Sequence, residues 1–239
     1  MLKLGINVNP LQGFTAQETA DLHVRYVRFP LWDNELDFYI EYSKELLALG
    51  MQPIYVMDSR TWKDWPDTSD WRLLPGRFFQ MGNEPDIVSP SSFTQPSESF
   101  SADLTWAREW LGKKKYIIAG GLASGNPSFL DGVSLKPVNA IAIHPYGQRS
   151  SQDFPSQGWG VGDVWDLTAA YKRFKKPIWI TEFGGPIAEF ASREQRSEYV
   201  SQMLDHFNRE HLVAGIYFCY SDDMAEGFGL DEEIISLLR

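Results

Sequence analysis

The chain has 239 residues, which is the length of one large domain or two small ones. Its 22 Lys and Arg residues are outnumbered by 32 Asp and Glu residues, and the net charge of −10 argues against nucleic acid and anionic membrane as partners, because basic surfaces bind both. A single cysteine excludes an internal disulfide framework and a zinc site built from several cysteines.

Eight short apolar runs recur along the chain and predict eight strands. Most are nearly continuous rather than alternating, which is typical of parallel strands buried on both faces. The runs are Lys3–Val8, Tyr26–Pro30, Pro53–Met57, Arg77–Gly82, Tyr116–Gly120, Ala140–His144, Pro177–Phe183 and Ala214–Tyr220.

Helical patterns lie between several of these runs. Capping boxes at Thr15–Glu18 and Ser192–Gln195 each predict the start of a helix. Further helical patterns cover Asn34–Leu49, Ala102–Leu111 and Asp163–Phe174. Strands that alternate with helices predict a compact, single-domain (β/α)8 barrel of the α/β class, a TIM barrel, over residues 1–239. A doubly wound sheet is the alternative, but its Gly-rich phosphate-binding turn is missing after the first run.

The N-terminal residues carry neither the charged segment nor the long apolar run of a signal peptide. No stretch approaches the roughly 20 apolar residues that span a membrane. We therefore expect a cytoplasmic protein from the sequence as given, although a secreted protein without its leader would read the same way.

The carboxyl ends of the strands carry the catalytic residues of such barrels. Two strongly hydrophobic runs end in a glutamate, Glu84 and Glu182, and a buried carboxylate is costly unless it is paired or functional. A salt bridge to Arg28 on the barrel rim would explain one such glutamate. Two of them at separate strand ends, with Asn83 before the first, favour a catalytic pair.

Paired carboxylates across a small pocket suit glycoside hydrolysis. One donates a proton to the glycosidic oxygen, while the other attacks the anomeric carbon or activates a water molecule. The distance between the two groups decides between these mechanisms, and the residues alone leave both open.

Two motifs resemble those of a known group. Asn83-Glu84-Pro85 and Ile180–Gly184 are similar to the ends of strands 4 and 7 in clan A glycoside hydrolases, the 4/7 superfamily of retaining (β/α)8 glycosidases, with its cellulase-like and β-xylosidase-like branches nearest. The resemblance implies hydrolysis of β-linked O-glycosidic bonds by double displacement, in an oligosaccharide, polysaccharide or glycoside substrate. Glu84 would be the acid/base and Glu182 the nucleophile.

The resemblance also implies roles for the neighbours of these glutamates. Asn83 would bind the sugar 2-hydroxyl, Arg28 would keep Glu182 ionised, and Tyr146 would donate a hydrogen bond to Glu182. His144 would line the pocket, either binding a hydroxyl or supporting the acid/base, unless it is a satisfied core histidine.

Aromatic side chains are candidate sugar platforms. Phe218 stands where the clan usually has a tryptophan as the floor of the sugar site, and Trp62 and Trp159 lie in polar loops. Trp65, Trp71 and Trp165 share such loops, where a ring can equally pack on the barrel. Tryptophans on regular elements are expected to be packing residues: Trp106, Trp110 and Trp179.

Two other functions compete with hydrolysis. A non-catalytic carbohydrate-binding barrel would keep the Trp-rich loops but has no need of both glutamates. A phosphate-handling or metal-dependent barrel has only weak support, from Gly184-Gly185 and Gly227–Gly229. His206 and His211 lack a third ligand nearby and are expected at the surface. We therefore predict an enzyme without metal or cofactor.

Overall fold

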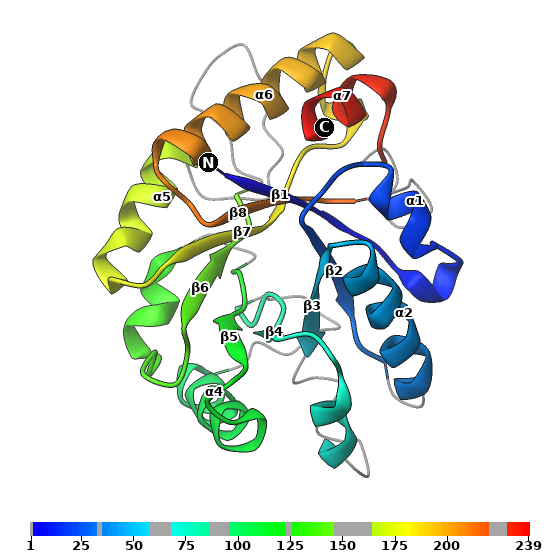
Figure 1. The fold of residues 1–239 in the computed structure, drawn as a ribbon. Coiled ribbons are helices and arrows are strands. Elements are labelled where there is room, and N and C mark those ends of the chain that lie inside the picture. The colour runs from blue at the N-terminus through cyan, green and yellow to red at the C-terminus, as the bar shows by residue number, and fades with distance from the viewer. Residues whose placement is uncertain are drawn as a thin grey trace.

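The computed structural model describes residues 2–32, 35–57, 68–86, 96–122, 126–145, 164–219 and 229–239. Eight parallel strands form a closed barrel in which each strand pairs with the next and β8 pairs with β1 (Figure 1). They are β1 (Lys3–Asn7), β2 (Tyr26–Pro30), β3 (Gln52–Met57), β4 (Phe78–Met81), β5 (Tyr116–Ala119), β6 (Ala140–Ile143), β7 (Ile178–Phe183) and β8 (Ala214–Tyr217). The predicted (β/α)8 architecture is confirmed.

Helices surround the barrel (Figure 1). They are α1 (Ala16–Ala20), α2 (Leu36–Ala48), α4 (Ser97–Leu111), α5 (Val164–Tyr171), α6 (Arg193–Arg209) and α7 (Glu232–Leu238). The predicted capping box is present at the start of α1. Thr15 Oγ1 accepts a hydrogen bond from the Glu18 backbone nitrogen, and Glu18 Oε2 accepts one from the Thr15 backbone nitrogen. Ser192 caps α6 by accepting from the backbone nitrogen of Gln195. Only α4 begins clearly earlier than the sequence pattern predicted.

The lower interior of the barrel is filled by apolar side chains from the first residues of the strands. Trp179 lies at its centre, with its ring centroid 4.9 Å from Tyr26 and 5.3 Å from Phe78. We call this set the floor layer: Tyr26, Ile54, Phe78, Ile118, Ala140, Ala142, Trp179, Ala214 and Ile216. Because its side chains are buried against one another, it closes the barrel beneath the carboxyl ends of the strands.

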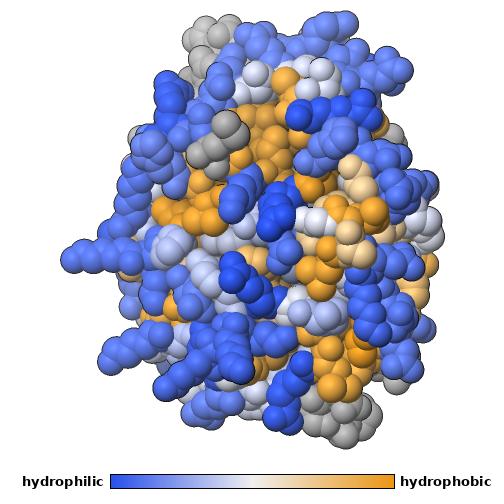
Figure 2. All heavy atoms as spheres, viewed as in Figure 1, coloured by the Kyte–Doolittle hydropathy of each residue, from blue (hydrophilic) through white to orange (hydrophobic). Residues whose placement is uncertain are grey.

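A second, larger core lies between the strands and the helices. Its members alternate along the strands with those that point inward, as Val27 and Phe29 do on either side of Arg28. Burial of such side chains removes each from water at a gain of about 1.5–3 kcal/mol. Polar residues cover most of the rim of the face in Figure 2, and apolar residues show nearer its middle.

Two smaller expectations have different outcomes. His206 was expected at the surface and this is wrong: it is 6% exposed, and its Nε2 lies 2.7 Å from Thr168 Oγ1, which links α6 to α5. His211 is exposed as expected, and Cys219 is fully buried as a packed thiol. No helix among the described residues combines the length and apolar character that crossing a bilayer requires.

Candidate active site

Polar side chains follow the floor layer at the carboxyl ends of the strands. Three inward-facing residues of the floor layer are each followed two positions later by a polar one: Tyr26 by Arg28, Phe78 by Gln80 and Trp179 by Thr181. Side chains two residues apart in a strand point to the same face, about 7 Å further along. On these three strands the barrel interior therefore changes from apolar to polar within one step.

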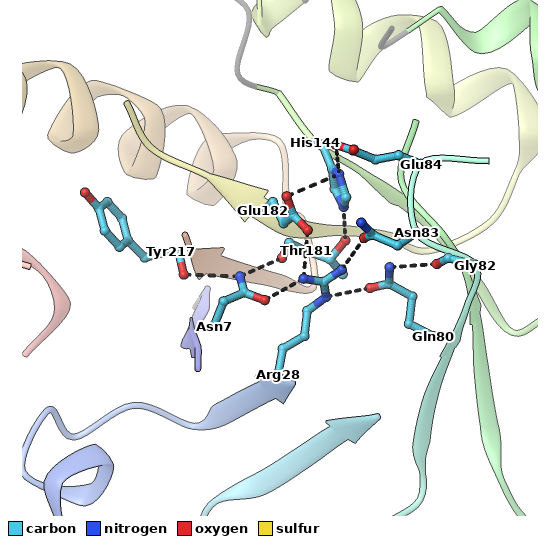
Figure 3. A network of polar contacts seen from close by, with 10 residues as sticks. All are labelled: Asn7, Arg28, Gln80, Gly82, Asn83, Glu84, His144, Thr181, Glu182 and Tyr217. Atoms are coloured by element: carbon cyan, nitrogen blue, oxygen red, sulfur yellow. Dashed lines mark hydrogen bonds and ion pairs between the residues drawn. The ribbon is translucent and has the colours of Figure 1, made fainter. Parts of the chain in front are cut away.

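Arg28 is the centre of these polar contacts and is only 5% exposed (Figure 3). Its Nη1 donates to Glu182 Oε1 at 2.8 Å and to Asn7 Oδ1 at 2.5 Å. Its Nη2 donates to Asn83 Oδ1 at 2.7 Å, and its Nε donates to Gln80 Oε1 at 2.8 Å. We call these five residues the Arg28 network. A buried guanidinium at this distance stabilises the ionised form of the Glu182 carboxyl.

His144 lies between the two glutamates (Figure 3). Its Nδ1 is 3.2 Å from Glu84 Oε1 and 3.5 Å from Glu182 Oε2, and its Nε2 is 3.0 Å from Thr181 Oγ1. The His144 side chain is fully buried, whereas that of Glu84 is 20% exposed. One oxygen of each glutamate and a ring nitrogen of His144 lie within 4.8 Å of one another. The carboxylates thus face the same small space.

The turn after β4 places Glu84. Gly82 has φ +79° and Glu84 has φ +50°, a conformation that costs a non-glycine residue about 1–3 kcal/mol. The Glu84 backbone nitrogen donates to the Gly121 carbonyl at 3.0 Å, which holds the turn against the end of β5. A Cβ on Gly121 would lie 2.3 Å from the His144 ring, so glycine is required where this ring packs.

Three residues with site contacts were not assigned a role from the sequence: Asn7, Gln80 and Thr181. Asn7 also donates from Nδ2 to the backbone carbonyls of Thr181 at 3.1 Å and Tyr217 at 3.2 Å, which ties β1 to β7 and β8. The signal for all three was available, because each is a polar residue within or ending an otherwise apolar strand. The structure brings them together with Arg28, Asn83, Glu84, His144 and Glu182, all predicted as site residues.

The predicted aromatic platforms are placed only in part. Phe218 follows β8, is half-buried, and donates its backbone nitrogen to the Phe183 carbonyl at 2.9 Å, next to the end of β7. Trp71 is only 4% exposed and packs near Tyr39, so it belongs to the core. Trp106 and Trp110 stack on each other and Trp179 is buried, as expected of packing residues. Three predicted substrate-binding residues lie outside the described residues: Trp62, Tyr146 and Trp159.

Trp32 is an aromatic residue that the sequence did not single out. It is 45% exposed, and Leu31 before it still pairs with β3 through a 3.0 Å bond to the Val56 carbonyl. Side chains alternate along this strand, with Tyr26 and Arg28 inward and the outer core receiving Val27, Phe29 and Leu31. Trp32 therefore continues the row of Arg28 beyond the barrel mouth.

Glu84, His144 and Glu182 also offer three ligand atoms to a cation. However, the guanidinium of Arg28 lies 2.8 Å from Glu182 and opposes a second positive charge there. We assign no metal to these side chains.

A parallel eight-stranded barrel with two carboxylates at its carboxyl end is the arrangement of clan A glycoside hydrolases, as the sequence motifs predicted. The family described as glycosyl hydrolase catalytic core matches residues 77–235, and the chain belongs to this family. The chain is thus a glycosidase. No curated protein sequence matches it.

Solved structures share the fold at low sequence identity. The chain is similar to Cel5A of Thermotoga maritima in complex with mannotriose, at 18% identity over 100% of this chain and 97% of that one, with a TM-score of 0.71. A broad specificity GH5-4 endoglucanase from Clostridium acetobutylicum gives 14% identity, 99% and 95% coverage and a TM-score of 0.68. A GH5 xyloglucanase from Bacteroides ovatus, in complex with an XXXG heptasaccharide, has 11% identity over 99% of this chain and 74% of that one, with a TM-score of 0.64.

Proposed function

We propose that the protein is a retaining glycosidase that cleaves β-linked O-glycosidic bonds by double displacement, with residues 1–239 as one catalytic domain. The approach of Glu84 and Glu182 to within 4.8 Å, measured between one oxygen of each, carries this proposal. Carboxyl groups about 5–5.5 Å apart are typical of retaining enzymes, whereas inverting enzymes need about 6.5–9.5 Å to admit a water molecule between them and the sugar.

In the first step, Glu84 gives its proton to the glycosidic oxygen and Glu182 attacks the anomeric carbon. The bond to the leaving group breaks, and an ester forms between the sugar and Glu182. In the second step, Glu84 takes a proton from water, which attacks the anomeric carbon and releases Glu182. The 2.8 Å contact with Arg28 supports Glu182 as the ionised nucleophile, and the greater exposure of Glu84 supports its exchange of protons with leaving group and water.

Two neighbours orient these groups in the proposal. Arg28 donates to Asn83 Oδ1, which fixes the amide so that its Nδ2 is the end that would donate to the sugar 2-hydroxyl. His144 contacts both carboxylates and is held from behind by Thr181, so it would keep Glu84 aimed at the glycosidic oxygen.

The substrate we propose is a β-linked oligosaccharide or polysaccharide. Structures similar to this one hold mannotriose, cellobiose or an XXXG heptasaccharide, and this variety supports the class of substrate rather than one sugar. Phe218 would stack beneath the reacting sugar, and Tyr146 would donate a hydrogen bond to Glu182. Trp62 and Trp159 would bind sugars further along the chain.

The test is a panel of aryl β-glycosides and soluble polysaccharides, followed by NMR of the product at early times. We expect the first-formed anomer to keep the β configuration. A 2-deoxy-2-fluoro glycoside with an activated leaving group should leave a sugar ester on the peptide that contains Glu182, detected by mass spectrometry. An α anomer as first product would overturn the retaining mechanism. Saccharide binding without hydrolysis by the wild type would favour the non-catalytic binding barrel.

A further inference from the structure

Gln80 is the third residue of β4 and its side chain is completely buried. Its Oε1 accepts from Arg28 Nε at 2.8 Å, and its Nε2 donates to the Gly82 carbonyl at 3.0 Å (Figure 3). The orientation of the amide follows from its partners, because the guanidinium Nε only donates and a carbonyl only accepts. Glutamine therefore supplies both a hydrogen-bond acceptor and a hydrogen-bond donor at one buried position.

The two ends of this amide contact groups that hold the two catalytic carboxylates. The oxygen end holds Arg28, whose Nη1 is bonded to Glu182. The nitrogen end holds the carbonyl of Gly82, the residue that begins the turn to Asn83 and Glu84. Gly82 and Glu84 both have positive φ, so this turn depends on fixed backbone contacts. A displacement at Gln80 would thus move both carboxylates relative to each other.

The neutrality of Gln80 matters as much as its bonds. Three of the four groups that accept from Arg28 are uncharged amide oxygens, and the fourth is the Glu182 carboxylate. The amides therefore orient the guanidinium without neutralising it. Among the described residues, the other ionisable groups near Glu182 are His144, which follows β6 and lies 3.5 Å from Glu182, and Glu84, which follows β4.

We propose that Gln80 is a positioning residue whose neutral amide joins Arg28 to the turn carrying Glu84 and leaves the charge of Arg28 for Glu182. This inference rests on the proposed function for its effect on rate. It makes a separate statement about the free protein, namely that a negative charge at position 80 competes with Glu182 for Arg28.

The isosteric substitution Gln80→Glu tests the charge. A protonated carboxyl at this position accepts from Arg28 and donates to Gly82 as glutamine does. An ionised one loses the bond to Gly82 and pairs with Arg28. Activity of Gln80→Glu should therefore fall at high pH, where its new carboxyl ionises. The same ionised carboxyl draws Arg28 away from Glu182. Over the range in which both carboxyls titrate, Glu182 should therefore bind a proton more readily, and the acid limb of kcat/KM should move up by about one pH unit.

Two comparisons separate this effect from a general disturbance. Gln80→Met keeps the volume and removes both bonds, so kcat should drop about 100-fold across the pH range, with KM near the wild-type value. Gln52→Glu makes the same chemical change at a half-buried glutamine at the start of β3, at the other end of the barrel, and should keep the wild-type pH profile.

Carboxyl-carbon NMR of the free proteins provides the readout that needs no turnover. In Gln80→Glu the signal of Glu182 should titrate at higher pH than in the wild type. If the wild type hydrolyses nothing, the proposed function fails and this titration still tests Gln80. A Gln80→Glu profile parallel to that of the wild type, with an unchanged Glu182 titration, would show that Gln80 only fills space. If Gln80→Met does not fold, the isosteric variant alone decides.

Discussion

The interior of the barrel holds two layers of opposite character on the same strands. In the floor layer, Trp179 packs against Tyr26 and Phe78, and the contacts are apolar and non-directional. One step further, the Arg28 network consists of buried polar groups, each bonded to a particular partner. A core of the first kind depends on filled volume, whereas one of the second kind depends on the identity of every member.

This difference indicates that stability and activity are held by separate layers. Volume changes in the floor layer should reduce the free energy of unfolding while the charges above keep their places. Charge changes in the mouth of the barrel should reduce turnover while the packed core remains. Four variants, compared on a common scale of free energy, can break or sharpen this separation.

The largest effect is expected for Glu182→Gln. Loss of the nucleophile should reduce kcat about 10⁴-fold or more, roughly 5 kcal/mol in the barrier, measured with an aryl β-glycoside. The melting temperature should change much less than the barrier, because the amide keeps the volume and can still accept from Arg28, although the buried ion pair is lost. Glu45→Gln, an exposed glutamate on α2, is the matched control and should change neither quantity. Full activity of Glu182→Gln would remove Glu182 from the mechanism.

Glu84→Gln should show the next largest effect, and only with poor leaving groups. Without a proton donor, kcat/KM for a polysaccharide should drop about 10³-fold, roughly 4 kcal/mol, because general acid catalysis contributes about 10²–10⁴-fold. Glycosides with an activated aryl leaving group need no such proton and should lose far less. Kinetics on both substrates provide the measurement, and equal losses would contradict the acid/base role.

Ile118→Ala attacks the floor layer, where Ile118 is completely buried. The cavity should reduce the free energy of unfolding in urea by about 3 kcal/mol. We expect kcat to stay near the wild-type value at temperatures where the variant is folded. A large loss of kcat in the folded variant would mean that the two layers are coupled, and the separation drawn above would be wrong.

Trp32→Ala should have the smallest effect. Removing an aromatic surface beyond the mouth of the barrel should raise KM for an oligosaccharide about fivefold, roughly 1 kcal/mol, with kcat unchanged. Leu49→Ala, another exposed apolar residue but at the end of α2, is the control and should keep the wild-type KM. An unchanged KM in Trp32→Ala would show that this ring takes no part in sugar binding.

Particular residues show how much of the fold and of the site could be predicted from the sequence. The continuous apolar runs identified each strand, because parallel strands buried on both faces require such runs. Glu84 and Glu182 stood out since a carboxylate at the end of an apolar strand is costly without a role. Gln80 did not stand out in the same way, although its side chain is more deeply buried than those of Glu84 and Glu182. An uncharged amide costs less to bury than a carboxylate, so its place in an apolar strand does not by itself indicate a role.

Contacts between elements far apart in the chain could not be predicted from the sequence. His206 carries no mark that distinguishes it from His211, yet only the packing of α6 against α5 buries it beside Thr168. Trp71 lies in the same kind of polar segment as other tryptophans, and its burial near Tyr39 depends on where the segment returns to the barrel.

The sequence by itself determined the closed barrel, the clan and the two glutamates, because hydrophobic runs, capping residues and strand-end motifs are local patterns. Only the tertiary structure decided that Arg28 reaches Glu182, Asn7, Asn83 and Gln80 together. Arg28 and these partners come from β1, β2, β4, β7 and the turn after β4. Their distances depend on the register of the closed barrel, in which Arg28 lies opposite Asn7 on one side and Ile54 on the other. Register is a property of pairing between strands, and no single strand contains it.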